Sequence, residues 1–190
     1  MNRRDALNRV ALLLGGTVVG GSVFLEGCKT VDKKVAAGLP LTKENIALMD
    51  EVAETIIPTT STPGAKAAKV GEFMNTMVVD CYEEKDQKVF LEGIGKLDEA
   101  CNKMHKHSFM KASPEHRKEL LVAVDKEAKD YNKDKKPEDP NHYFSLIKQL
   151  TLLGYFTSEI GCTQALRYEA VPGRYEGCVP YKKGDKAWAT

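Results

Sequence analysis

The feature that most constrains the fold is the spacing of apolar residues, which recur every three or four positions in four or five segments. In residues 70–81 they occupy the i, i+3, i+4, i+7, i+8 and i+11 positions, as Val70, Phe73, Met74, Met77, Val78 and Cys81. This spacing places the side chains on one face of an α-helix. No segment shows the alternation of a half-buried strand. We therefore predict an all-α domain, a single compact bundle of about five helices with an irregular C-terminal tail.

The other expected helices have recognisable ends. Thr42 can cap a helix that Pro58 stops, and Ser113 followed by Pro114 is a typical helix start. The helix after Thr42 has the apolar stripe Ile46, Met49, Val52, Ala53 and Ile56. A helix over residues 90–104 has the stripe Phe90, Ile94, Leu97, Cys101 and Met104. The helix after Ser113 has the stripe Leu120, Leu121, Val124, Ala128 and Tyr131. Residues 143–160 are apolar on nearly every face, which predicts the central helix of the bundle. An irregular loop is expected near residues 58–69, and the chain after Gly161 is rich in glycine and proline.

The N-terminus has the layout of an export signal. Arg3 and Arg4 precede an uncharged stretch over residues 10–25, and with Leu7 they resemble the twin-arginine signal of proteins that cross a membrane already folded. A membrane-spanning anchor is the alternative, but a span needs about 20 apolar residues. We predict a signal peptide over residues 1–27.

The stretch ends at Leu25, Glu26, Gly27 and Cys28, which resembles the lipobox of bacterial lipoproteins. Glu26 departs from the small residue usual at that position. Lipidation of Cys28 would supply more than one acyl chain, which is the condition for stable membrane attachment. Residues 28–41 then form a short tether, residues 42–190 form the domain, and the protein is expected in the periplasm, anchored to the inner or the outer membrane.

The charge balance gives no indication of an electrostatic partner such as nucleic acid. Removing residues 1–27 takes three arginines and two acidic residues from the 28 basic and 27 acidic residues of the chain, leaving 25 of each. Nucleic-acid binding needs a basic face or stripe.

Four cysteines remain beyond Cys28 in a compartment that permits disulfides. Cys162 and Cys178 flank a turn-rich segment, and a bridge between them would contribute about 3 kcal/mol in the chain-entropy account. Two reduced thiols are the alternative. Cys81 and Cys101 lie on apolar stripes of consecutive helices, where cysteine usually behaves as a small hydrophobe. A bridge between these two helices is the alternative.

Catalytic and cofactor motifs are missing from the sequence. Cys101, His105 and His107 could approach one ion, but a structural site normally has a second ligand pair, and His116 and His142 are isolated in sequence. The chain contains no Gly-x-Ser-x-Gly, no dinucleotide or phosphate-binding glycine loop and no haem attachment motif. We expect no catalytic residue, metal or bound cofactor in this chain.

Three stretches together resemble the small third subunit of gluconate 2-dehydrogenase. They are Glu54–Thr59 with Thr62–Lys66; Leu150–Gly161; and Tyr168–Pro180 with Val171, Pro172, Gly173, Tyr175 and Gly177. The resemblance covers about residues 42–190. It implies a non-catalytic subunit of a periplasmic dehydrogenase that oxidises a sugar or a sugar acid. The catalytic partner would be a large FAD-bearing subunit of the glucose-methanol-choline type, and a haem-bearing cytochrome is often a further subunit.

In such complexes the small subunit can supply the export signal for a flavoprotein that lacks one. The candidate interface residues are Pro58, Pro63, Gly64, Tyr168, Pro172, Gly173, Tyr175 and Trp188. Two alternatives are a structural lipoprotein without a redox partner, and an independent enzyme that uses His142, Glu159 or the histidines near residue 105.

Overall fold

The computed structural model describes residues 41–174 and 176–189. Five α-helices make up most of this part of the chain: α2 (Lys43–Ile56), α3 (Val70–Cys81), α4 (Glu84–His105), α5 (Pro114–Asp134) and α6 (Tyr143–Phe156). The 3₁₀ turn η1 (Phe109–Lys111) precedes α5, and the π-helical turn η2 (Gly161–Ala165) follows α6. The predicted all-α bundle is confirmed. Arg3, Arg4, Cys28 and the tether lie outside the described residues.

Local sequence signals account for the helix starts. The Thr42 hydroxyl accepts a hydrogen bond from the Asn45 N–H, and the Ser113 hydroxyl accepts one from the His116 N–H, as the cap predictions require. Pro114 occupies the first turn of α5, where a missing N–H costs nothing.

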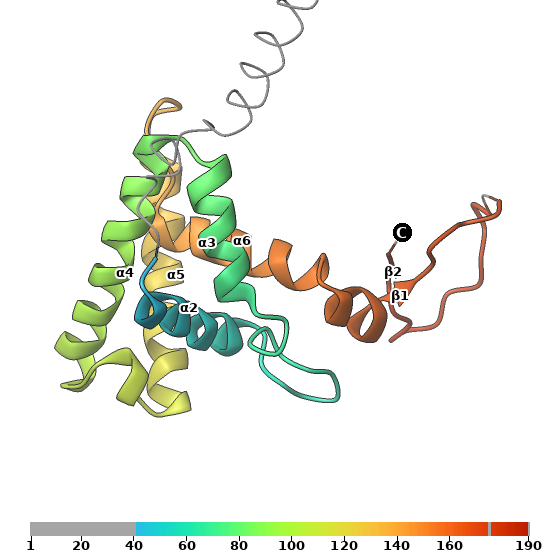
Figure 1. Ribbon diagram of the computed structural model, residues 1–190, viewed down its shortest axis with the longest axis horizontal. Helices are drawn as coiled ribbons and strands as arrows, with labels where there is room; N and C mark the ends of the chain where they lie inside the picture. Colours follow the sequence, from blue (N-terminus) through green and yellow to red (C-terminus); the bar gives the residue numbers. More distant parts are fainter. Residues whose placement is uncertain (1–40, 175, 190) are drawn as a thin grey trace, which may run out of the picture. The chain divides into compact units, whose positions relative to one another are not determined.

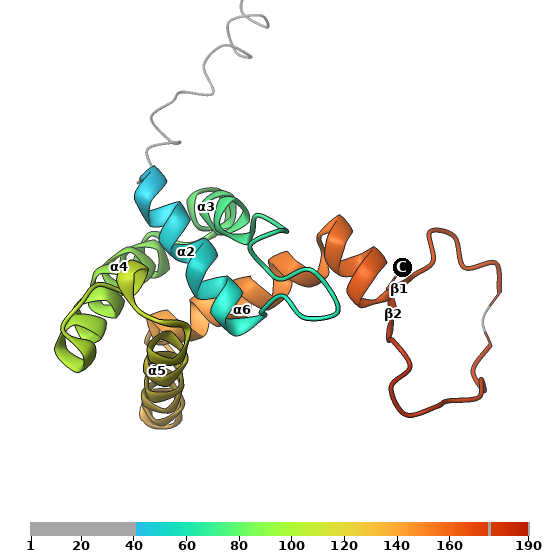
Figure 2. The ribbon, with the colours of Figure 1, turned by 90° about the horizontal axis from the view of Figure 1, so that it is seen from below.

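Helix α6 is the centre of the bundle. It contacts α2, α3, α4 and α5, and Figures 1 and 2 show it running across the other helices. Its buried residues are Tyr143, Phe144, Leu146, Ile147, Leu150, Thr151, Gly154 and Tyr155. Apart from Thr151 and Gly154, these residues pack in one hydrophobic core with side chains from all the predicted stripes. The prediction of a central helix is therefore confirmed.

Periodicity overestimates burial at the helix ends. Cys81 at the end of α3, Met104 at the end of α4 and Tyr131 near the end of α5 are exposed, although each continues the apolar stripe of its helix. Helix α6 ends at Phe156, short of the predicted residue 160, and Leu152, Leu153 and Phe156 are exposed. None of the helices in the described part of the chain combines the length and the hydropathy that a membrane span requires.

The chain after η2 is extended and carries the only strands of the described residues. Strand β1 (Arg167–Tyr168) pairs in parallel with β2 (Trp188–Ala189), with Arg167 opposite Trp188 and Tyr168 opposite Ala189. The residues between the strands leave β1 and return to it, as Figure 2 shows. This short ladder was not predicted, since two-residue strands leave no alternation to detect.

Candidate partner interface

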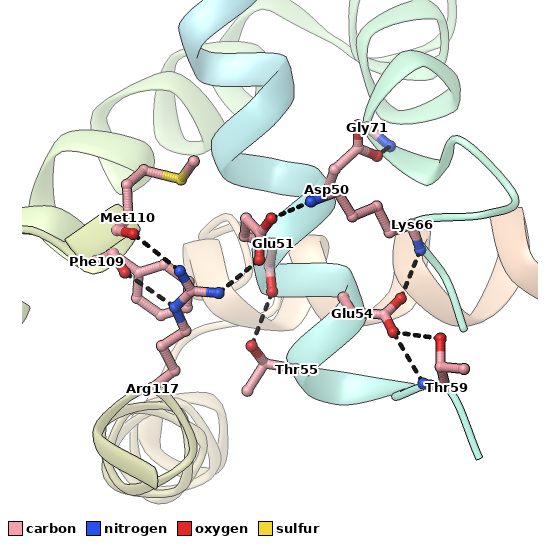
Figure 3. Close-up of polar contacts among 10 residues, drawn as sticks. All are labelled: Asp50, Glu51, Glu54, Thr55, Thr59, Lys66, Gly71, Phe109, Met110 and Arg117. Carbon is pink, nitrogen blue, oxygen red and sulfur yellow. Dashed lines mark hydrogen bonds and ion pairs between the residues drawn. The ribbon is translucent and has the colours of Figure 1, made fainter. Parts of the chain in front are cut away.

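Three carboxylates on the second half of α2 hold the loop between α2 and α3 (Figure 3). Asp50 Oδ1 accepts a hydrogen bond of 2.7 Å from the N–H of Gly71, in the first turn of α3. Glu54 accepts bonds from the backbone N–H of Thr59 at 2.8 Å and of Lys66 at 2.9 Å, and from the Thr59 hydroxyl at 2.7 Å. Both ends of the loop are therefore tied to α2.

Glu51 lies between two cations. Its carboxylate forms ion pairs with Lys66 in the loop and with Arg117 on α5, and the Glu51 and Arg117 side chains are each only 16% exposed. Arg117 also donates from Nε to the Phe109 carbonyl at 3.0 Å and from Nη2 to the Met110 carbonyl at 2.9 Å. This one guanidinium thus joins α5, η1 and α2.

The environment of each carboxylate sets the direction of its pKa. The hydrogen bond from Lys66 lowers the pKa of Glu51, burial opposes the shift, and Arg117 adds to the lowering. Burial alone would raise the pKa of Glu54, but the hydrogen bonds from Lys66 and Thr59 outweigh it and lower the pKa. Burial raises the pKa of Asp50, and the Gly71 N–H offsets this only in part.

Helix α6 fixes the middle of the loop from the other side. The hydroxyl of the buried Tyr155 donates to the Pro63 carbonyl at 2.7 Å, across 92 positions in sequence. Gly64 is buried against Glu54, and a Cβ at this position would lie 2.3 Å from the Glu54 carboxylate oxygens, so only glycine fits without a shift. Residues 58–61 are exposed. The loop is therefore held at several points along its length, while the side chains of residues 58–61 face solvent.

The predicted interface residues fall into two groups. Pro58 is exposed at the start of the loop, while Pro63 and Gly64 lie in its middle, beside Tyr155 and Glu54. Tyr168, Pro172, Gly173 and Trp188 are exposed in the C-terminal segment, and Tyr175 lies outside the described residues.

The predicted Cys162–Cys178 bridge stays a prediction. Both residues are free thiols in this structure, with Cys178 exposed. The Cys162 Sγ donates to the Phe156 carbonyl at 3.0 Å, which places it against the end of α6.

The structure brings together histidines that appeared isolated in sequence. The rings of His105 and His116 stack with centroids 4.2 Å apart, and His107 lies 6.1 Å and 5.5 Å from them. Cys101 is buried away from solvent, and burial raises the pKa of its thiol. Among the described residues, no three His, Cys, Asp or Glu side chains are arranged to hold a metal ion.

Two other residues considered for chemistry have no reactive arrangement. His142 Nδ1 accepts from the Phe144 N–H at the start of α6, and burial lowers the pKa of this imidazole. The Glu159 carbonyl accepts from the Thr163 hydroxyl, and its side chain is exposed. Sequence reasoning missed Glu51 and Arg117, although the acidic i, i+3 pair Glu51 and Glu54 just before a proline loop was a usable signal.

Comparison with known proteins identifies the family. The family model described as gluconate 2-dehydrogenase subunit 3 matches residues 43–173, which include the five helices, the loop and β1. Comparisons with curated proteins and with solved structures gave no match. Since the matched range covers well over half of the sequence, the chain belongs to the gluconate 2-dehydrogenase subunit 3 family and is a small subunit of a dehydrogenase complex.

Proposed function

We propose that this chain is the non-catalytic small subunit of a periplasmic flavin-dependent dehydrogenase that oxidises a sugar or a sugar acid. Its partner is a large subunit of the glucose-methanol-choline type that carries FAD, and a haem-bearing cytochrome c takes the electrons onward. The small subunit supplies the export signal, the membrane tether and a stabilising surface.

The loop between α2 and α3 is the observation that carries this proposal. Glu51, Glu54 and Asp50 are all engaged in holding the chain itself, so their carboxylates are not directed at a substrate. Residues 58–61, the exposed part of the loop, are a proline and three short hydroxylated residues. A segment of this composition loses little conformational freedom on binding, which favours a role in docking to another protein.

Export of the partner explains the twin-arginine signal. A flavoprotein that must fold around FAD before crossing the membrane needs a route for folded proteins. A partner without a signal of its own can use that of the small subunit if the two bind before export. The lipid on Cys28 then keeps the exported complex at the membrane.

The proposal is tested by co-expressing the chain with the flavoprotein of the neighbouring reading frame. Changing Arg3 and Arg4 together to lysine should leave both proteins in the cytoplasm, whereas Arg9→Lys should not. Export of the flavoprotein in the absence of this signal would contradict the proposed role.

Two further measurements separate the tether from catalysis. Cys28→Ala should move the complex from the membrane fraction to the soluble periplasm, or leave the precursor unprocessed. The small subunit purified alone should show no flavin absorbance and oxidise no sugar. A stoichiometric flavin on this chain alone would overturn the accessory role.

A further inference from the structure

The C-terminal segment closes on itself without burying a side chain in the bundle. Every described residue of 167–188 is exposed. Its two ends are nevertheless joined, because the Arg167 N–H donates to the Ala187 carbonyl at 2.8 Å and the Glu169 N–H donates to the Ala189 carbonyl at 2.9 Å. The Arg167 guanidinium also lies 4.5 Å from the Trp188 ring centroid. We refer to residues 167–189 as the C-terminal clasp.

The clasp surrounds a hollow of about 1020 Å³. Its lining includes the apolar residues Pro172, Val179 and Trp188. It also includes the charged residues Glu169, Arg174 and Glu176, which we call the rim. Val179 is 50% exposed and Trp188 is 54% exposed. Apolar side chains grouped around a hollow of this size are typical of a site that another molecule covers.

The charged residues of the rim indicate which side chains a molecule bound in the hollow would have. Arg174 is paired with Glu176, whereas Glu169 makes no ion pair with any described residue. The rim therefore presents one uncompensated carboxylate beside an apolar hollow. A complementary occupant places an apolar side chain in the hollow and a lysine or arginine next to Glu169.

The backbone of the clasp favours an extended occupant. The Arg167 and Glu169 N–H groups face β2, so the N–H of Tyr168 between them points to the other edge of β1. No strand of the described residues pairs with that edge. A free edge of this kind can accept an added strand through main-chain hydrogen bonds.

We propose that the C-terminal clasp holds an extended segment of the large dehydrogenase subunit, with an apolar side chain against Trp188 and a basic side chain against Glu169. This inference rests on the proposed function, which supplies a different polypeptide as the partner. The family match ends at residue 173, so β2 and Trp188, which complete the clasp, lie outside it.

Photo-crosslinking in the assembled complex tests the position of the partner. In one variant a photoreactive amino acid replaces Val179 in the hollow. In the matched control the same amino acid replaces the exposed Val122 on α5. Only the Val179 variant should crosslink, and peptide mapping should find one segment of the large subunit with neighbouring apolar and basic residues. Crosslinks that join only two copies of this chain, or none in an intact complex, would overturn the clasp proposal.

Binding measurements with two clasp variants test its chemistry. Glu169→Lys and Trp188→Ala should each raise the Kd for the large subunit about tenfold or more, while Trp188→Phe restores most of the affinity. Glu99→Lys, an exposed charge reversal on α4, is the control and should leave the Kd unchanged. Circular dichroism should be the same for all variants, since the clasp buries no core residue.

The outcomes separate the two proposals. If the two subunits do not associate at all, the proposed function fails and the clasp assignment fails with it. If they associate with the same Kd in Glu169→Lys and Trp188→Ala as in the wild type, the accessory role stands and the clasp is not the binding site.

Discussion

Glu51 takes part in holding both the loop and the bundle. Its carboxylate is mostly buried between Lys66 and Arg117 and thereby links α2 to the loop and to α5. Removing one member of a buried pair leaves the other charge without compensation, which costs more than the pair itself contributes. Arg117 keeps its bonds to the Phe109 and Met110 carbonyls, so part of its charge stays satisfied.

Glu51→Gln should therefore lower the free energy of unfolding by about 2 to 3 kcal/mol. Urea unfolding followed by circular dichroism measures the change. The control is Glu92→Gln, because Glu92 pairs with Lys96 on the exposed face of α4 and should cost less than about 0.5 kcal/mol. Equal effects of the two changes would mean that burial of the Glu51 pair has no energetic consequence.

The lowered pKa of Glu51 predicts how the loss of stability in Glu51→Gln depends on pH. A carboxyl whose pKa is lower in the folded state contributes stability above its unfolded pKa, here 4.5, and loses it as the pH falls through the folded value. A protonated Glu51 resembles glutamine. The stability difference between the wild type and Glu51→Gln should thus shrink as the pH is lowered from neutral to below 4.5. A constant difference across this range would contradict the assignment.

At the scale of the elements, local signals predicted the helices well and their contacts poorly. The caps at Thr42 and Ser113 depend on residues three positions away, which a sequence displays directly. The Arg117–Glu51 pair joins residues 66 positions apart, and no periodicity indicates which polar side chains will meet. For the same reason His116 appeared isolated from His105, although their rings stack once α4 and α5 pack.

The bond between α6 and the loop makes an element-scale prediction. Tyr155→Phe removes the donor to the Pro63 carbonyl and should cost about 1 kcal/mol. Hydrogen exchange should accelerate at the Ala65 amide, which bonds to the Ile57 carbonyl at the base of the loop. Tyr131→Phe is the matched control, because the Tyr131 hydroxyl is exposed and makes only a 3.4 Å contact with Pro140. Unchanged exchange at Ala65 in Tyr155→Phe would show that α6 does not hold the loop.

At the scale of the whole molecule, the described chain divides into a hydrophobic core and a C-terminal clasp that lies outside it. The core is built from α2 to α6 with Leu41, Ala65, Phe109 and Ala112, and the clasp contributes no side chain to it. Glycine, proline and aromatic residues indicated correctly that the tail has no core of its own. They did not indicate that the two ends of the tail pair as β1 and β2. This pairing joins residues about 20 positions apart through backbone groups, which every sequence possesses.

Deleting residues 174–190 should therefore leave the bundle folded. Its helical circular dichroism should persist, and the free energy of unfolding should change by less than about 0.5 kcal/mol. For comparison, Leu150→Ala in the core should cost about 2 to 5 kcal/mol. An unfolded truncated chain would show that the tail belongs to the core after all.

The Tyr155 contact with Pro63 also determines when the loop can take its final shape during synthesis. The two residues are 92 positions apart, so at about 5 to 20 residues per second the ribosome adds Tyr155 roughly 5 to 18 s after Pro63. Until α6 has emerged, the nascent chain has carboxylates to anchor the ends of the loop but no hydroxyl to fix its middle. A partner that recognises the finished loop therefore cannot engage the growing chain until its translation is nearly complete.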